Sequence, residues 1–148
     1  MKKGVCLLLI LSWMLSAFCA CSSAKASENS QQAAEAYDVD LTEMSQLMRY
    51  SEVNYILGNP QEFLGKTIKI EGYFYIYEAD IRNVYVCIVP DSTACCTAGL
   101  EFRLAGEHRY PEDYPPSDAE ITVVGTFAAY SDDEGETICY QLEDARIL

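Results

Sequence analysis

An alternation of apolar and polar side chains that begins at Lys66 is the feature that most constrains the fold. Every second position of this stretch is apolar or glycine, the members being Ile68, Ile70, Gly72, Phe74 and Ile76. A period of two predicts a long β-strand that buries one face. Because a glycine in the interior of a strand marks a bend or a bulge, Gly72 predicts that this strand curls.

Four more segments have the composition of strands, and turn residues separate them. They span residues 83–89, 100–104, 120–130 and 136–148. The connection 105–119 contains three prolines and cannot be a strand. Five strands, the first long and bent, with a long connection between the third and the fourth, is the plan of an OB-fold. We therefore predict a mainly β chain with a five-stranded OB-like Greek-key barrel. An immunoglobulin-like sandwich is the alternative, but it requires about seven strands.

A short N-terminal helix is expected before the first strand. Asp40 and Glu43 have the spacing of a helix capping box, and Gly58 and Pro60 form a stop signal. A second helix that starts at Ser51 is the alternative. The apolar residues in this segment recur at helical spacing, and they include Met44, Leu47, Met48, Val53, Ile56 and Leu57. We interpret them as a stripe buried in the core rather than as thioether ligands of a metal.

The first residues of the chain have the order of an export signal. A positive start is followed by an apolar run over residues 5–15 and then by small residues up to Cys21. The run is shorter than the roughly 20 residues that a membrane-spanning helix needs. The pair Ala20-Cys21 resembles the lipobox of bacterial lipoproteins, which implies cleavage before Cys21 and lipidation of that residue. The alternative is an ordinary secretory signal that is cleaved nearby.

These signals divide the chain into three parts. Residues 1–20 are expected to be a lipoprotein signal peptide, and residues 21–39, which are small and polar, a flexible tether. Residues 40–148 are expected to form one OB-like domain. We expect the lipid to hold the mature protein at the extracytoplasmic side of the cell membrane.

The chain is strongly acidic, with 23 Asp and Glu against 10 Lys and Arg and a net charge of −13. Cleavage of the signal would remove Lys2 and Lys3 and leave 8 basic against 23 acidic residues, a charge of −15. Such a surface repels phosphate groups, so nucleic acid is not expected as a partner. It also repels an anionic membrane surface, so attachment is expected to come from the lipid.

Four cysteines belong to the predicted domain, namely Cys87, Cys95, Cys96 and Cys139. The third and fifth strands of an OB barrel are parallel neighbours. Cys95 and Cys96 precede the third strand and Cys139 lies near the start of the fifth, so these three sulfurs are expected to meet at one rim. Cys87, on the second strand, is either a fourth member of the group or a small core residue.

Four interpretations of these sulfurs remain open. The first is a disulfide from Cys139 to Cys95 or Cys96. The second is a site for a soft metal ion such as zinc, with the single histidine, His108, as a further candidate ligand. The third is a redox-active dithiol or vicinal disulfide between Cys95 and Cys96, and the fourth is simple packing of inert thiols.

Three tyrosines form a second candidate site. Tyr73, Tyr75 and Tyr77 alternate on the outer face of the first strand, where such rings can contact a sugar or a protein surface. The alternative is that the helix or the prolyl connection covers them. The acidic turn 132–136 does not have the ligand order of an EF-hand loop. The sequence contains no pattern that indicates a hydrolytic triad, so we expect binding rather than catalysis.

The segment 91–102, DSTACCTAGLEF, also carries a resemblance. It resembles a loop of uncharacterised single-domain lipoproteins of Gram-positive bacteria. It is also similar to the Cys-Cys loop in the soluble domain of putative permease-associated membrane proteins. The Gly65-Lys66 start of the first strand and the strand that contains Gly125 extend the resemblance over residues 64–148. The resemblance implies an OB-like fold and functional roles for Cys95 and Cys96. A membrane-protein partner is a separate expectation.

The sequence thus predicts a lipid-anchored extracytoplasmic binding module that depends on a metal or on thiols through its Cys-Cys loop. The alternative is a structural or interaction lipoprotein of a membrane assembly, with cysteines that serve only as a disulfide staple. A thiol oxidoreductase of the cell envelope is a third hypothesis, but nothing in the sequence resembles a thioredoxin fold.

Overall fold

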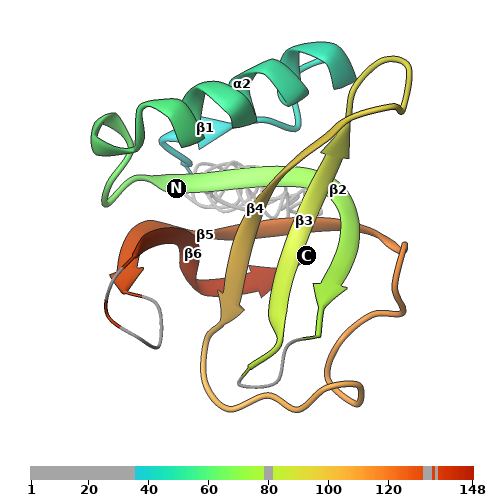
Figure 1. Ribbon diagram of the computed structural model, residues 1–148, viewed down its shortest axis with the longest axis vertical. Coiled ribbons are helices and arrows are strands. Elements are labelled where there is room, and N and C mark those ends of the chain that lie inside the picture. Colours follow the sequence, from blue (N-terminus) through green and yellow to red (C-terminus); the bar gives the residue numbers. More distant parts are fainter. Residues whose placement is uncertain (1–35, 79–81, 132–134, 136) are drawn as a thin grey trace, which may run out of the picture. The chain divides into compact units, whose positions relative to one another are not determined.

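The computed structural model describes residues 36–78, 82–131, 135 and 137–148. This part of the chain is mainly β, as predicted, and α2 lies at one end of the sheet (Figure 1). The elements are β1 Val39–Asp40, α2 Gln46–Gly58, the 3-10 turn η1 Pro60–Glu62, β2 Thr67–Tyr77, β3 Val84–Pro90, β4 Thr97–Leu104, β5 Glu120–Ser131 and β6 Ile138–Ile147. The expected signal peptide and the lipidation residue Cys21 lie outside the described residues.

In the described part of the chain the strands form one six-stranded sheet of order β1-β2-β3-β4-β6-β5. β2 exchanges partners along its length, because residues 67–73 pair with β5 and residues 73–77 pair with β3. β4 and β6 run parallel, as predicted for the third and fifth strands, but the ladder joins only three residue pairs. The prediction of a five-stranded barrel is therefore corrected. A short sixth strand, β1, is present, and the interrupted ladders do not make a closed barrel.

The core lies between the inward-facing residues of the strands and α2. Ile68, Ile70 and Phe74 of β2 are fully buried, which confirms the inward register predicted for this strand. The other strands contribute apolar residues to the same cluster, including Cys87, Val89, Leu100, Phe102, Val123, Phe127 and Leu142. Each fully buried aliphatic or aromatic side chain of this kind contributes about 1.5–3 kcal/mol of transfer free energy.

Close approach between strands requires two of the glycines that lie within strands, Gly72 and Gly125. A Cβ atom on Gly72 would overlap the carbonyl oxygen of Ile88 and would lie 3.0 Å from Cys87 Sγ. A Cβ atom on Gly125 would lie 2.9 Å from Leu142 Cβ, and the β5–β6 register shifts at this position. The irregularity expected from a strand glycine thus occurs at Gly125, whereas Gly72 marks the point where β2 exchanges partners.

Ser45 is the N-cap of α2, and its hydroxyl accepts a hydrogen bond from the backbone N–H of Met48 at 3.4 Å. The predicted cap at Asp40 is wrong. Asp40 belongs to β1, and its carboxylate accepts hydrogen bonds from the backbone and the hydroxyl of Thr42. Pairing of β1 with β2 is a tertiary interaction, and the local spacing that indicated a capping box does not reveal it.

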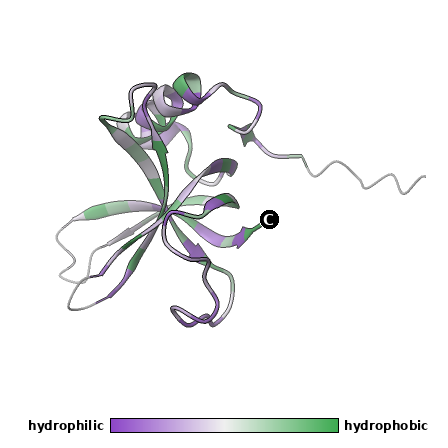
Figure 2. Ribbon diagram, turned by 90° about the vertical axis from the view of Figure 1, so that its right-hand side faces the viewer, coloured by the Kyte–Doolittle hydropathy of each residue, from purple (hydrophilic) through white to green (hydrophobic). Residues whose placement is uncertain are grey.

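Only part of the expected apolar stripe of α2 is buried. Val53 and Ile56 are fully buried, whereas Leu47 and Met48 are 54% and 60% exposed. Apolar and polar residues alternate along the helix (Figure 2). The prediction of a continuous buried stripe is therefore wrong at Leu57, which is 41% exposed, and in the first turn, where a charged residue takes the inward position.

That residue, Arg49, joins α2 to β2. Its guanidinium donates hydrogen bonds to the carbonyl oxygens of Leu41, Met44 and Glu71 at 3.0, 3.3 and 3.1 Å. It also donates to Oε1 of Glu71 at 3.2 Å, and its side chain is only 12% exposed. One side chain therefore satisfies several backbone acceptors where the helix meets the sheet, which explains why Leu47 and Met48 face outward instead.

Candidate functional site

The candidate site is the short loop 91–96 between β3 and β4. The backbone N–H of Asp91 donates to the carbonyl of Cys96 at 2.8 Å and closes the loop. Ala94 has a φ of 55°, a left-handed conformation that turns the chain just before the two cysteines. In an extended segment consecutive side chains point to opposite faces, so this turn is what allows two adjacent cysteines to face the same space.

The Asp91 carboxylate organises this loop. Its Oδ1 accepts hydrogen bonds from the backbone N–H groups of Thr93 and Cys95, each at 3.0 Å. The hydroxyl of Thr93 donates to the same carboxylate at 3.1 Å. Aspartate side chains commonly stabilise a turn in this way, by accepting hydrogen bonds from nearby backbone N–H groups. The loop is thus held from within by Asp91, the residue that directly follows β3.

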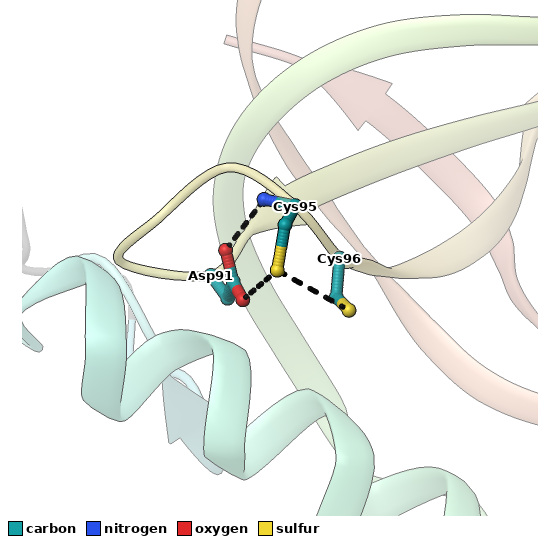
Figure 3. A group of neighbouring side chains, drawn as sticks. All are labelled: Asp91, Cys95 and Cys96. Atoms are coloured by element: carbon teal, nitrogen blue, oxygen red, sulfur yellow. Dashed lines mark hydrogen bonds between the residues drawn. The ribbon is translucent and has the colours of Figure 1, made fainter.

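Three potential metal ligands meet in the loop (Figure 3). The Cys95 thiol lies 3.7 Å from Cys96 Sγ and donates a hydrogen bond to Asp91 Oδ2 at 3.3 Å. Ligand atoms of all three residues lie within 4.8 Å of one another, and no other group of three such residues occurs among those that the structure describes. Both cysteines are exposed, so the group is open to solvent.

The surroundings of the loop favour an ionised Asp91 carboxylate and a protonated Cys96 thiol. Slight desolvation acts to raise the pKa of Asp91, but the hydrogen bonds from Cys95 and Thr93 outweigh it and hold that pKa below its ordinary value. The pKa of Cys96 is raised, chiefly by its hydrogen bond with Cys95, then by desolvation and by the nearby Asp91 charge. A cation that binds here therefore meets a fixed negative charge and must displace thiol protons.

A contact with α2 fixes the position of the loop. The side-chain amide of Gln46, the first residue of the helix, donates to the carbonyls of Pro90 and Asp91 at 3.3 and 3.1 Å. Figure 3 shows the helix running beside the loop. The candidate site therefore sits on a loop that is held by its own aspartate and by a neighbouring helix.

Cys139 does not join this group, in contrast to the prediction. Glu101 lies beside Gln141 in the parallel ladder, so Cys139 falls level with Gly99. Gly99 is three residues beyond Cys96, which corresponds to about 10 Å along a strand. The predicted strand order was right, but the register places Cys139 farther along the sheet. All four cysteines of the described part are free thiols, so the disulfide interpretation finds no support there.

Cys87 is a core residue. Its side chain is fully buried, and desolvation raises the pKa of its thiol to about 12. A thiol in this state stays protonated at neutral pH and is a poor nucleophile. Of the two predictions for Cys87, the packing role is the one that its burial supports.

His108 also lies outside the metal-ligating group. Its ring Nε2 lies 2.9 Å from the carbonyl oxygen of Ala105, and Nδ1 lies 4.0 Å from the Asp113 carboxylate. These contacts hold it within the long β4–β5 connection, whereas the loop 91–96 lies near α2 at the other end of the sheet (Figure 1). It is not part of the Asp91, Cys95 and Cys96 group.

The outer tyrosines of β2 are exposed, which does not fit the interpretation that the helix or the prolyl connection covers them. Tyr73, Tyr75 and Tyr77 are 41%, 37% and 55% exposed, and the rings of Tyr75 and Tyr77 lie 4.9 Å apart. The prolyl connection packs elsewhere, since its Tyr114 stacks on Tyr85 with ring centroids 4.0 Å apart. The acidic turn considered for calcium lies largely outside the described residues.

Sequence reasoning missed Asp91 as a member of the site. The available signal was its place directly after a strand, with Thr93 two residues later, an arrangement typical of an aspartate-capped turn.

Comparison of the chain with protein-family models, with curated proteins and with solved structures gave no match. In the described part of the chain, no helix has the length and apolar character that crossing a membrane requires.

The burial of Cys87 and the exposure of Cys95 and Cys96 predict how these three thiols react with an alkylating reagent. In the native protein we expect Cys95 to be modified readily and Cys87 to be protected until unfolding. Because the raised pKa of Cys96 reduces its thiolate fraction, its modification should accelerate as the pH is raised above neutral. Peptide mapping by mass spectrometry would measure each residue. Native modification of Cys87 at the rate of Cys95 would contradict the buried assignment.

Proposed function

We propose that the chain is a lipid-anchored extracytoplasmic binding module that takes up a soft metal ion through Cys95 and Cys96. The observation that carries this proposal is the convergence of Asp91, Cys95 and Cys96 on one exposed loop. Thiolates are the ligands that zinc and other soft ions prefer in proteins. We propose a binding role and not an enzymatic one.

The OB-like architecture belongs to the same proposal. It is supported by the order of the ladders, in which β2 pairs with both β3 and β5, and β6 lies between β4 and β5. A membrane-protein partner belongs to the proposal, because the lipid anchor would hold the domain beside the membrane. The acidic charge of the chain argues against nucleic acid in that role.

Metal binding is the direct test. We expect zinc added to the reduced protein to be retained at one ion per chain, because three donors already lie together. The affinity for zinc should fall at least about tenfold when Cys95→Ser or Cys96→Ser removes a thiolate. Cys139→Ser is the matched control and should bind as the natural protein does. Equal binding by all three variants, measured by competition with a chromophoric chelator, would reject the site.

The anchor has its own test. Because Ala20-Cys21 follows a short apolar run, we expect the mature protein to begin with a diacylated or triacylated Cys21. Mass spectrometry of the amino-terminal peptide from the membrane fraction measures this. The Cys21→Ala variant should accumulate as an uncleaved precursor or leave the membrane. An unmodified amino terminus at a different residue would contradict the assignment.

An interaction lipoprotein is the second candidate function. The exposure of Tyr73, Tyr75 and Tyr77 on one strand supports it, because tyrosine is enriched where proteins contact one another. This function does not depend on the cysteines, so variants at Cys95 and Cys96 would leave it intact while abolishing metal binding.

A further inference from the structure

We infer that Asp91, Cys95 and Cys96 hold a single zinc-like ion in a tetrahedral site of three protein ligands, with the fourth position open to a donor from outside the chain. This inference rests on the proposed metal-binding function and specifies its coordination. It implies that the bound ion can be exchanged with a partner or small ligand that offers a thiolate or an imidazole.

The spacing of the sulfurs matches a tetrahedral ion. Two thiolates bound at about 2.3 Å with a tetrahedral angle between them lie about 3.8 Å apart. Cys95 Sγ and Cys96 Sγ are 3.7 Å apart. A linear arrangement with bonds of the same length would require about 4.6 Å. The pair therefore fits the bite of a tetrahedral ion without a change in the loop.

The carboxylate has a matching position. An oxygen bound at about 2.0 Å and a sulfur at about 2.3 Å on a tetrahedral ion lie about 3.5 Å apart. Asp91 Oδ2 and Cys95 Sγ are 3.3 Å apart. An ion would occupy the place of the proton that Cys95 now donates to this oxygen. Binding forms two S–metal bonds and one O–metal bond, and the two thiol protons pass to solvent.

The two carboxylate oxygens of Asp91 have different hydrogen-bond partners. Oδ1 accepts the backbone N–H groups of Thr93 and Cys95, which fold the loop. Oδ2 lies against the Cys95 sulfur, and the Thr93 hydroxyl, 3.2 Å from Oδ2 and 3.1 Å from that sulfur, would turn away from both when an ion binds. Coordination through Oδ2 therefore leaves the backbone hydrogen bonds of the loop in place. The three donors are organised before the ion arrives, and this reduces the ordering cost of binding.

The fourth position is open because no further ligand is at hand in the described residues. The group of ligating side chains there ends with these three, and Cys87 is buried in the core. Structural zinc sites use four protein ligands, whereas sites with three keep a place for water or an exchangeable ligand. Both cysteines are exposed, so an outside donor has access to the ion.

Cobalt(II) in place of zinc tests the coordination in the full-length chain. We expect one cobalt per chain, visible d–d bands of tetrahedral intensity, and a sulfur-to-cobalt charge-transfer band that corresponds to two thiolates. Added imidazole should shift the d–d bands as it enters the open position. Octahedral bands, no response to imidazole, or four thiolates per ion shared by two chains would each overturn this inference. Metal binding through the loop, the proposed function itself, would survive these outcomes and would fail only if neither ion binds.

The variant Asp91→Asn tests the third ligand. The amide keeps a carbonyl oxygen for the backbone hydrogen bonds but removes the charged donor, so zinc affinity should fall at least about tenfold. Asp113→Asn, in the β4–β5 connection, is the matched control and should leave it unchanged. Native alkylation of Cys95 reports that the loop is intact. Unchanged zinc affinity in Asp91→Asn would show that Asp91 is not a ligand. If Asp91→Asn loses binding and also alters the alkylation of Cys95, the variant Asp91→Glu decides. Asp91→Glu should restore zinc binding if a carboxylate ligates, and failure to restore it would contradict the assignment.

Discussion

Replacing Gly72 with alanine is expected to destabilise the domain by on the order of 3 kcal/mol, at the upper end of overpacking costs. The added methyl group would overlap the carbonyl oxygen of Ile88 and press on Cys87 Sγ. A backbone oxygen cannot move aside as the end of a flexible side chain can, so β2 and β3 must separate. Because β2 exchanges partners beside this residue, the strain reaches both of its ladders.

Gly58→Ala is the matched control for this substitution. A Cβ atom at Gly58, the last residue of α2, meets nothing within 4 Å. Alanine in a helix is preferred to glycine by about 0.5–1 kcal/mol, so this variant should be equally or more stable. Urea unfolding followed by circular dichroism measures both variants. Equal stability of Gly72→Ala and the natural protein would show that the two strands do not approach as closely as described.

Replacing Arg49 with alanine is expected to cost about 3 kcal/mol of folding free energy. The change removes the hydrogen bonds to the carbonyls of Leu41, Met44 and Glu71 and leaves the Glu71 carboxylate without this partner. Breaking a largely buried ion pair typically costs about 3–5 kcal/mol, and the partial exposure of Glu71 places the expectation at the lower end. Thermal unfolding of the variant provides the measurement.

Arg103→Ala is the control for charge alone. Arg103 also pairs with a glutamate, Glu143, but its side chain is 63% exposed. Exposed ion pairs contribute roughly 0–1 kcal/mol, so this variant should unfold close to the natural protein. A stability loss in Arg49→Ala no larger than that of Arg103→Ala would show that α2 is held to the sheet mainly by Val53 and Ile56.

The strands were predictable because their signal is carried by the sequence itself. The alternation around Phe74 assigns one face of β2 to the core, and a single-residue shift would expose that whole face. The cap of α2 was not predictable in the same way. Asp40 has the chemistry of a cap, and only its pairing beside Lys69 in the sheet shows that it serves elsewhere.

The loop position of the two cysteines was predictable from the sequence, but the register of β6 along β4 was not. The loop position of Cys95 and Cys96 follows from Pro90 and Asp91 at the end of a strand. Whether Cys139 reaches them depends on how β6 slides along β4, and no feature near Cys139 determines that. The turn at Ala94 is equally hidden, because alanine does not favour a positive φ.

The position of β6 between β4 and β5 has a consequence for the biogenesis of the protein. A chain that is synthesised or delivered from its amino terminus presents β4 and β5 before the last strand arrives. Until then each of these two strands has an unpaired edge, and such edges recruit strands from other molecules. Proteolytic loss of β6 would leave both edges unpaired permanently. In the described part of the chain, β6 is therefore the strand that pairs the free edges of β4 and β5.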